Sequence, residues 1–274
     1  MGLGAFVRCN CYRDGLTTEP PFPREELLLD TDGYLCLITA ENAENELPYK
    51  EWQEKYGEAW WKLQHWKDRC CEHDHMKYAH EDVGNWYGVR HFTGIIESLG
   101  AEHFPLLSNI IPDGNDGSFP REDAEAAIRE LDLLVEMSGQ TEEVCLVDVD
   151  SGEEVYGYIS AWGGVFMFAW NHQVGLDPNG VFVVDPRNGQ ELFRSSHLKQ
   201  TLLAEKVNGD TPALLTCLDT GATCEVFSAI GNEEKDRELR IEKQPVDTEN
   251  LYAERALRKL LLASIETGNP IIWC

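Results

Sequence analysis

The chain has 274 residues, of which 49 are acidic and 23 are basic, and its formal net charge is −26. A field of this sign repels nucleic-acid phosphates and anionic membrane surfaces, and it attracts basic proteins. Hydrophobic residues make up 42% of the sequence, which is enough for a buried core and excludes a disordered chain. The length predicts one large domain or two modest ones.

The sequence shows none of the patterns that usually indicate secretion or a membrane anchor. We find no secretory signal and no run of roughly 20 apolar residues. The nine cysteines are an odd number in a long chain, whereas secreted disulfide frameworks are usually short with an even number. We therefore expect a bacterial, cytoplasmic protein with free or metal-bound thiols, which binds neither membrane nor nucleic acid.

Helices are expected mainly before residue 140. Leu3–Cys11 predicts a first strand and Glu26–Thr39 a hairpin. The clearest helix is Tyr49–Cys70, because large apolar residues recur there at helical spacing. They are Trp52, Tyr56, Trp60, Leu63 and Trp66. Two further helices are predicted at Gly84–Leu99 and Pro120–Met137.

After Ser138-Gly139 the sequence changes to short apolar runs separated by turns rich in Asp, Gly and Asn. Val144–Phe227 therefore predicts antiparallel strands. Within it, Val165–Trp170 is the longest apolar run and is expected to form a buried strand. Thr248–Ile265 predicts a C-terminal helix, and the apolar tail Asn269–Cys274 is expected to dock on the body.

The predicted fold class is therefore α+β, with a helix-rich N-terminal half and an antiparallel β-sheet in the C-terminal half, followed by a C-terminal helix. We divide the chain into a mixed helical region, 1–139, and a β region with the final helix, 140–274. The sequence leaves open whether these are two domains or one compact body.

Two short motifs have the residue types of a metal site. Cys9 and Cys11 lie two apart on a predicted strand, so that both side chains project to one face. Cys71 and His73 have the same spacing just after the long helix. Three sulfurs and one nitrogen suit a tetrahedral Zn²⁺ with no open position, which is typical of a structural site. Three neighbours could replace one of these ligands: Cys70, His75 and His80.

The alternative is that Cys9 and Cys11 are ordinary buried thiols and that the second motif is a solvated loop. The start Cys9-Asn10-Cys11-Tyr12, the Pro-rich loop after it, and Cys71-Glu72-His73 after a Trp-rich helix resemble a group of uncharacterised bacterial cytosolic proteins. The resemblance covers about the first half of the chain, and it implies no known activity.

The acidic residues are concentrated in two stretches. Residues 19–58 carry a net charge of −8 and residues 97–154 a net charge of −14, whereas residues 59–96 are balanced. The second stretch is the predicted surface for a basic protein partner. The alternative is that the acidity only keeps the protein soluble.

No catalytic residue is predicted, because the sequence lacks a phosphate-binding loop, an H-E-x-x-H helix and a G-x-S-x-G elbow. Two hypotheses follow. The first is a non-enzymatic, acidic protein-binding module with a structural zinc site, such as a toxin-neutralising protein of the immunity type. The second is a metal-dependent hydrolase that uses the Cys/His cluster with Glu72 and Asp74. The sequence leaves the oligomeric state open.

Overall fold

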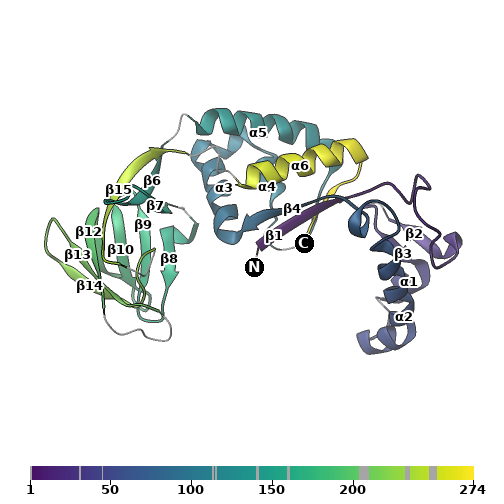
Figure 1. Cartoon of the computed structure of the whole chain (residues 1–274), viewed down its shortest axis with the longest axis horizontal. Coiled ribbons are helices and arrows are strands. Elements are labelled where there is room, and N and C mark those ends of the chain that lie inside the picture. The colour runs from purple at the N-terminus through teal and green to yellow at the C-terminus, as the bar shows by residue number, and fades with distance from the viewer. Residues whose placement is uncertain are drawn as a thin grey trace. The chain divides into compact units, whose positions relative to one another are not determined.

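The computed structural model divides into two compact units (Figure 1). Unit 1 comprises Met1–Leu134 and Glu249–Cys274, and unit 2 comprises Val135–Thr248. The structure describes residues 2–30, 32–44, 46–112, 114, 116–139, 142–158, 161–203, 210–231, 235–246 and 252–274. Helices and antiparallel sheets are both present and a long helix lies near the C-terminus, so the predicted α+β class with a C-terminal helix is confirmed.

A four-stranded antiparallel sheet is the centre of unit 1. Its strand order is β4-β1-β16-β5. The strands are β1 (Gly2–Arg8), β4 (Lys77–Asn85), β5 (Ser118–Phe119) and β16 (Ile271–Trp273). The C-terminal tail therefore docks as predicted, because β16 pairs with β1 on one side and with β5 on the other.

Two helices, α3 (Trp86–Leu99) and α6 (Tyr252–Thr267), pack against β1 and β4 of this sheet. The side chain of Asn85 caps α3 by accepting a hydrogen bond of 2.8 Å from the amide of Gly88, which replaces a missing helical partner. The apolar stripe of α6 is buried: Ala253, Ala256, Leu257, Leu260 and Leu261. The predicted start of this helix, at Thr248, lies outside the described residues.

The C-terminal helix belongs to unit 1, whereas the sequence analysis grouped it with the β region 140–274. The reason is long-range packing, since α6 lies against β4 and β1 from the first third of the chain. Local sequence carries no signal of which distant surface an amphipathic helix will cover.

The predicted hairpin and the Trp-rich helix form a separate part of unit 1 with a core of their own. The hairpin is β2 (Leu27–Leu29) and β3 (Leu35–Leu37), and it is followed by α1 (Ile38–Glu44) and α2 (Tyr49–Lys67). Their shared core includes Leu63, Trp52, Tyr56 and Trp66 of the predicted stripe. The remaining elements before unit 2 are η1 (Arg24–Glu26), η2 (Asp74–Met76), η3 (Ala101–His103), α4 (Leu107–Ile110), η4 (Arg121–Asp123) and α5 (Ala124–Ser138), the last of which crosses the boundary between the units.

Unit 2 consists of two antiparallel sheets that share one core, which includes Leu146 of one sheet and Val183 of the other. The six-stranded sheet has the order β14-β13-β12-β15-β6-β7 and the four-stranded sheet the order β11-β10-β9-β8. The elements are β6 (Glu142–Asp148), β7 (Glu154–Gly157), η5 (Ala161–Gly164), β8 (Val165–Phe168), β9 (Gln173–Asp177), β10 (Gly180–Asp185), β11 (Gln190–Ser195), β12 (His197–Leu202), β13 (Ala213–Cys217), β14 (Thr223–Val226) and β15 (Arg237–Pro245).

Two features of unit 2 differ from the sequence-based expectation. The nine-residue strand β15 lies beyond the predicted strand region Val144–Phe227, and it pairs with both β12 and β6. The strand predicted over Val165–Trp170 is present as β8, but the prediction that it is buried was wrong, because Phe168 and Trp170 are 56% and 81% exposed. No helix among the described residues has the length and apolarity of a membrane span.

Candidate metal site

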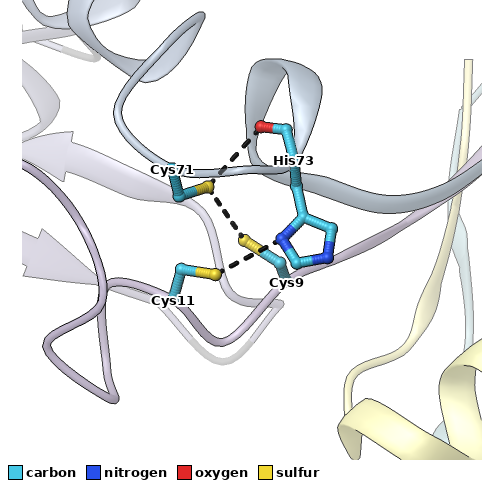
Figure 2. Close-up of side chains that lie close together, drawn as sticks. All are labelled: Cys9, Cys11, Cys71 and His73. Atoms are coloured by element: carbon cyan, nitrogen blue, oxygen red, sulfur yellow. Dashed lines mark hydrogen bonds between the residues drawn. The ribbon is translucent and has the colours of Figure 1, made fainter.

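The structure brings Cys9, Cys11, Cys71 and His73 together in unit 1 (Figure 2). The prediction that Cys9 and Cys11 lie on the first strand was wrong, because β1 ends at Arg8 and both residues lie in the loop that follows it. Cys71 and His73 lie in the segment between α2 and β4. One ligand atom from each residue lies within 4.8 Å of all the others. The four residues could therefore hold one metal ion between them.

The cysteines of the cluster are free thiols and are not joined by disulfide bonds. The Cys9 and Cys71 sulfurs are 3.8 Å apart, far beyond the roughly 2.05 Å of a disulfide bond. The Cys11 sulfur lies 3.3 Å from Nδ1 of His73. The Cys71 thiol also donates to the backbone carbonyl of His73 at 3.5 Å, so that the second motif folds back on itself (Figure 2).

Backbone hydrogen bonds join the two segments that carry the ligands. The amide of Cys9 donates to the carbonyl of Met76 at 2.9 Å, and the amide of Thr18 donates to the carbonyl of Cys70 at 2.7 Å. Within the first segment, the amide of Leu16 donates to the carbonyl of Cys11 at 2.7 Å. The ligand positions are therefore fixed by main-chain contacts as well as by the side chains.

Burial sets the protonation state of the thiols. Cys9 and Cys11 are both buried, and loss of hydration raises the pKa of each thiol. The neighbouring thiol of Cys71 raises the pKa of Cys9 further, whereas a hydrogen bond from the Cys11 amide opposes the shift. A bound metal would reverse this preference, because it binds the thiolate and displaces the proton.

Comparison with known proteins does not assign the chain to a family. No family model, curated protein or solved structure matches the chain. The resemblance to uncharacterised bacterial proteins stays a prediction, and the function has to be argued from the geometry of the site.

The three alternative ligands lie outside the cluster. The Cys70 thiol donates to the carbonyl of Lys67 at 3.7 Å, and burial raises its pKa to about 12. His75 turns away from the site and makes a 2.6 Å contact from Nδ1 to Asp68. His80 is an exposed residue of β4, in register with Phe6 of β1.

Aromatic side chains surround the cluster. Tyr12, Trp66 and Tyr78 pack against the buried thiols. The rings of Tyr12 and Trp66 meet edge to face with centroids 6.3 Å apart, and the His73 ring lies 5.3 Å from that of Tyr78. An apolar surround of this kind lowers the local dielectric and strengthens the attraction between a cation and its ligands.

A second group of possible ligands lies in unit 2 and was not predicted. It consists of Glu143, Cys145 and Glu154, on the paired strands β6 and β7. Glu143 and Cys145 have the same i, i+2 spacing as Cys9 and Cys11, which is the signal that could have indicated them. Burial is the main cause that raises the pKa of Cys145, and the group offers three donors where the cluster in unit 1 offers four.

Proposed function

We propose that the protein is a non-enzymatic, acidic protein-binding module in which Cys9, Cys11, Cys71 and His73 hold a structural Zn²⁺. The observation that carries the proposal is that four residues from two distant parts of the chain each bring one donor atom within 4.8 Å of the others. A donor set of three thiolates and one imidazole is typical of structural zinc.

The spacing of the donors supports zinc in particular. With Zn–S bonds of about 2.3 Å and Zn–N bonds of about 2.0–2.1 Å, a tetrahedron has S···S edges of about 3.8 Å and S···N edges of about 3.6 Å. The Cys9–Cys71 sulfur separation is 3.8 Å, and the sulfur of Cys11 is 3.3 Å from the His73 nitrogen. These two separations lie within a few tenths of an ångström of the expected edges, and all the other donor–donor separations are at most 4.8 Å.

The same arrangement favours a structural role over the alternative of a hydrolase. Catalytic zinc needs an exchangeable position for water or substrate, and four protein ligands fill the tetrahedron. Glu72 and Asp74, the acids that a hydrolase would use here, are both exposed and supply no atom to the cluster. Zinc would instead fasten the end of β1 to the segment that follows α2.

The net charge of −26 supports a basic protein as the partner. Opposite charge speeds association and adds specificity. Toxins that attack nucleic acids need a positive surface to bind that anionic substrate, so a toxin-neutralising role is consistent with the negative charge of this protein. The acidic stretch 97–154 spans the boundary between the units, so each unit contributes part of its charge.

The metal is tested by elemental analysis of the purified protein. We expect one zinc per chain in the wild type and none in Cys71→Ser, with Cys274→Ser as a control because Cys274 is an exposed thiol outside the cluster. Zinc that exchanges freely and binds a hydroxamate or other open-site inhibitor would support the hydrolase. Protein that folds and purifies without any metal would refute the site.

The partner is tested by affinity capture from the native host, followed by mass spectrometry and by titration with each purified protein that is recovered. We expect a basic protein whose affinity falls steeply between low and physiological salt. Co-expression then tests whether the protein neutralises that partner. Recovery of no basic protein, together with no protection against toxicity, would refute the binding role.

A further inference from the structure

An aromatic hollow of about 360 Å³ lies on unit 2. Its size falls within the range of about 300–1,000 Å³ that is usual for ligand pockets. The side chains that matter here are Phe168, Trp170, Asn171, Asp210 and Phe227. We call this feature the aromatic hollow.

The walls of the hollow are held in place by hydrogen bonds. The turn between β8 and β9 is closed by a bond of 3.0 Å from the Ala169 amide to the carbonyl of His172. The ring of His172 then accepts a 3.1 Å bond at Nε2 from the amide of Phe227, and burial lowers its pKa, which favours the neutral ring that can accept. On the other side, the amide of Ala229 donates to the carbonyl of Thr211 at 2.8 Å.

These fixed walls present large rings to solvent. Trp170 is 81% exposed and Phe168 is 56% exposed, although a run of apolar residues in a strand would usually be buried. Exposed aromatic side chains on a rigid frame are typical of binding hot spots. Among the described residues that line the hollow, Asp210 is the one that carries a charge, and a carboxylate favours a cation as its partner.

We propose that the aromatic hollow binds an arginine side chain of the basic partner, a proposal that rests on the proposed function of the protein. A planar guanidinium stacks on aromatic rings and pairs with a carboxylate through two hydrogen bonds, which an ammonium group cannot do equally well. Trp170 and Phe168 supply the rings and Asp210 the carboxylate. The net charge of −26 attracts the basic protein that carries this arginine.

The experiment measures fluorescence anisotropy of a labelled arginine-rich peptide titrated with the whole protein. The test variants are Trp170→Ala and Asp210→Asn. The matched controls are Trp61→Ala, at an exposed Trp of unit 1, and Glu153→Gln, at an exposed acid of unit 2. Circular dichroism verifies that each variant is folded.

We expect each test variant to weaken binding by about fivefold or more, and each control by less than about twofold. Trp170→Phe should recover part of the affinity, and a lysine peptide of equal charge should bind more weakly than the arginine peptide. Equal binding by wild type and both test variants would overturn the proposal, as would the absence of saturable binding to the wild type.

The outcome is distinguishable from a failure of the proposed function. If a basic partner is captured equally by the wild type and both test variants, the binding module stands and the aromatic hollow is refuted. If no basic partner is captured but the peptide still depends on Trp170 and Asp210, the arginine site stands and the proposed function is refuted.

Discussion

Removal of the proposed zinc ion should destabilise unit 1 by an amount that follows from the chain length between Cys9 and Cys71. Cys9 and Cys71 are 62 residues apart in the sequence. A cross-link that closes a loop of this length lowers the entropy of the unfolded chain by an amount worth about 4 kcal/mol at 25 °C. A zinc ion that joins the same residues closes the same loop, so chelation or Cys71→Ser should lower the free energy of unfolding by about that much.

Urea denaturation followed by tryptophan fluorescence measures this loss. Six of the eight Trp residues lie in unit 1, so the signal reports mainly on the unit that contains the site. Hydrogen exchange with mass spectrometry then separates the two units, since the protection of unit 2 should not depend on the metal. Cys274→Ser is the control, and it should unfold like the wild type.

The loop-closure reasoning would be refuted by a particular result. If zinc is present and its removal changes the unfolding free energy of unit 1 by less than about 1 kcal/mol, the metal closes no loop that matters to folding. Equal loss of protection in both units would also contradict the argument, because all four ligands belong to unit 1.

Three further predictions concern the scaffold. Burial, with a contribution from Arg8, lowers the pKa of Lys67 to about 8. Between about pH 8 and 10.5 the Lys67 amine is protonated in the unfolded chain but neutral in the folded protein, so the free energy of unfolding rises with pH over this range. Lys67→Met should remove up to roughly 3 kcal/mol of that rise in denaturation curves measured across the same range. The Glu130 carboxylate accepts hydrogen bonds from two successive amides at the start of α4, so Glu130→Gln should cost about 1 kcal/mol in thermal unfolding, and no change would contradict the cap. In unit 2, a Cβ added at Gly175 would overlap the Phe182 ring. Gly175→Ala should therefore lower the free energy of unfolding of unit 2 by roughly 1–3 kcal/mol, as measured by hydrogen exchange, and should leave the metal content of the protein unchanged.

The long helices and the metal-ligand set follow from short-range patterns, which explains why the sequence indicates them. The stripe that contains Trp52 and Leu63 has helical spacing and forms the core side of α2. The pairs Cys9–Cys11 and Cys71–His73 each offer two donors at i, i+2 spacing, and the structure places both pairs in loops with bends and turns rather than within strands. Such patterns span a few residues, and local geometry is enough to interpret them.

Strand β4 and strand β15 could not be predicted in the same way, because their pairing is long-range. In β4, half-buried residues such as Tyr78 and Ala79 alternate weakly with exposed ones, and the strand is held by pairing with β1 and covered by α6. β15 contains charged residues along its length but pairs on both edges, with β12 and β6. Hydrogen bonding to distant strands outweighs the weak local propensity of both segments.

The selection of His73 over His75 as a ligand depends on a backbone turn that spacing does not encode. His75 and Met76 have φ angles of 52° and 58°, a left-handed conformation that costs roughly 1–2 kcal/mol for each residue that is not glycine. The turn is held by the bond from the Cys9 amide to the Met76 carbonyl and by the contact between His75 and Asp68. It leaves His73 facing Cys11 and sends His75 outward. Cys9 is at once a hydrogen-bond partner of this turn and a candidate ligand. Binding of a metal to its sulfur would therefore also stabilise the strained conformation, and would couple the turn to the site.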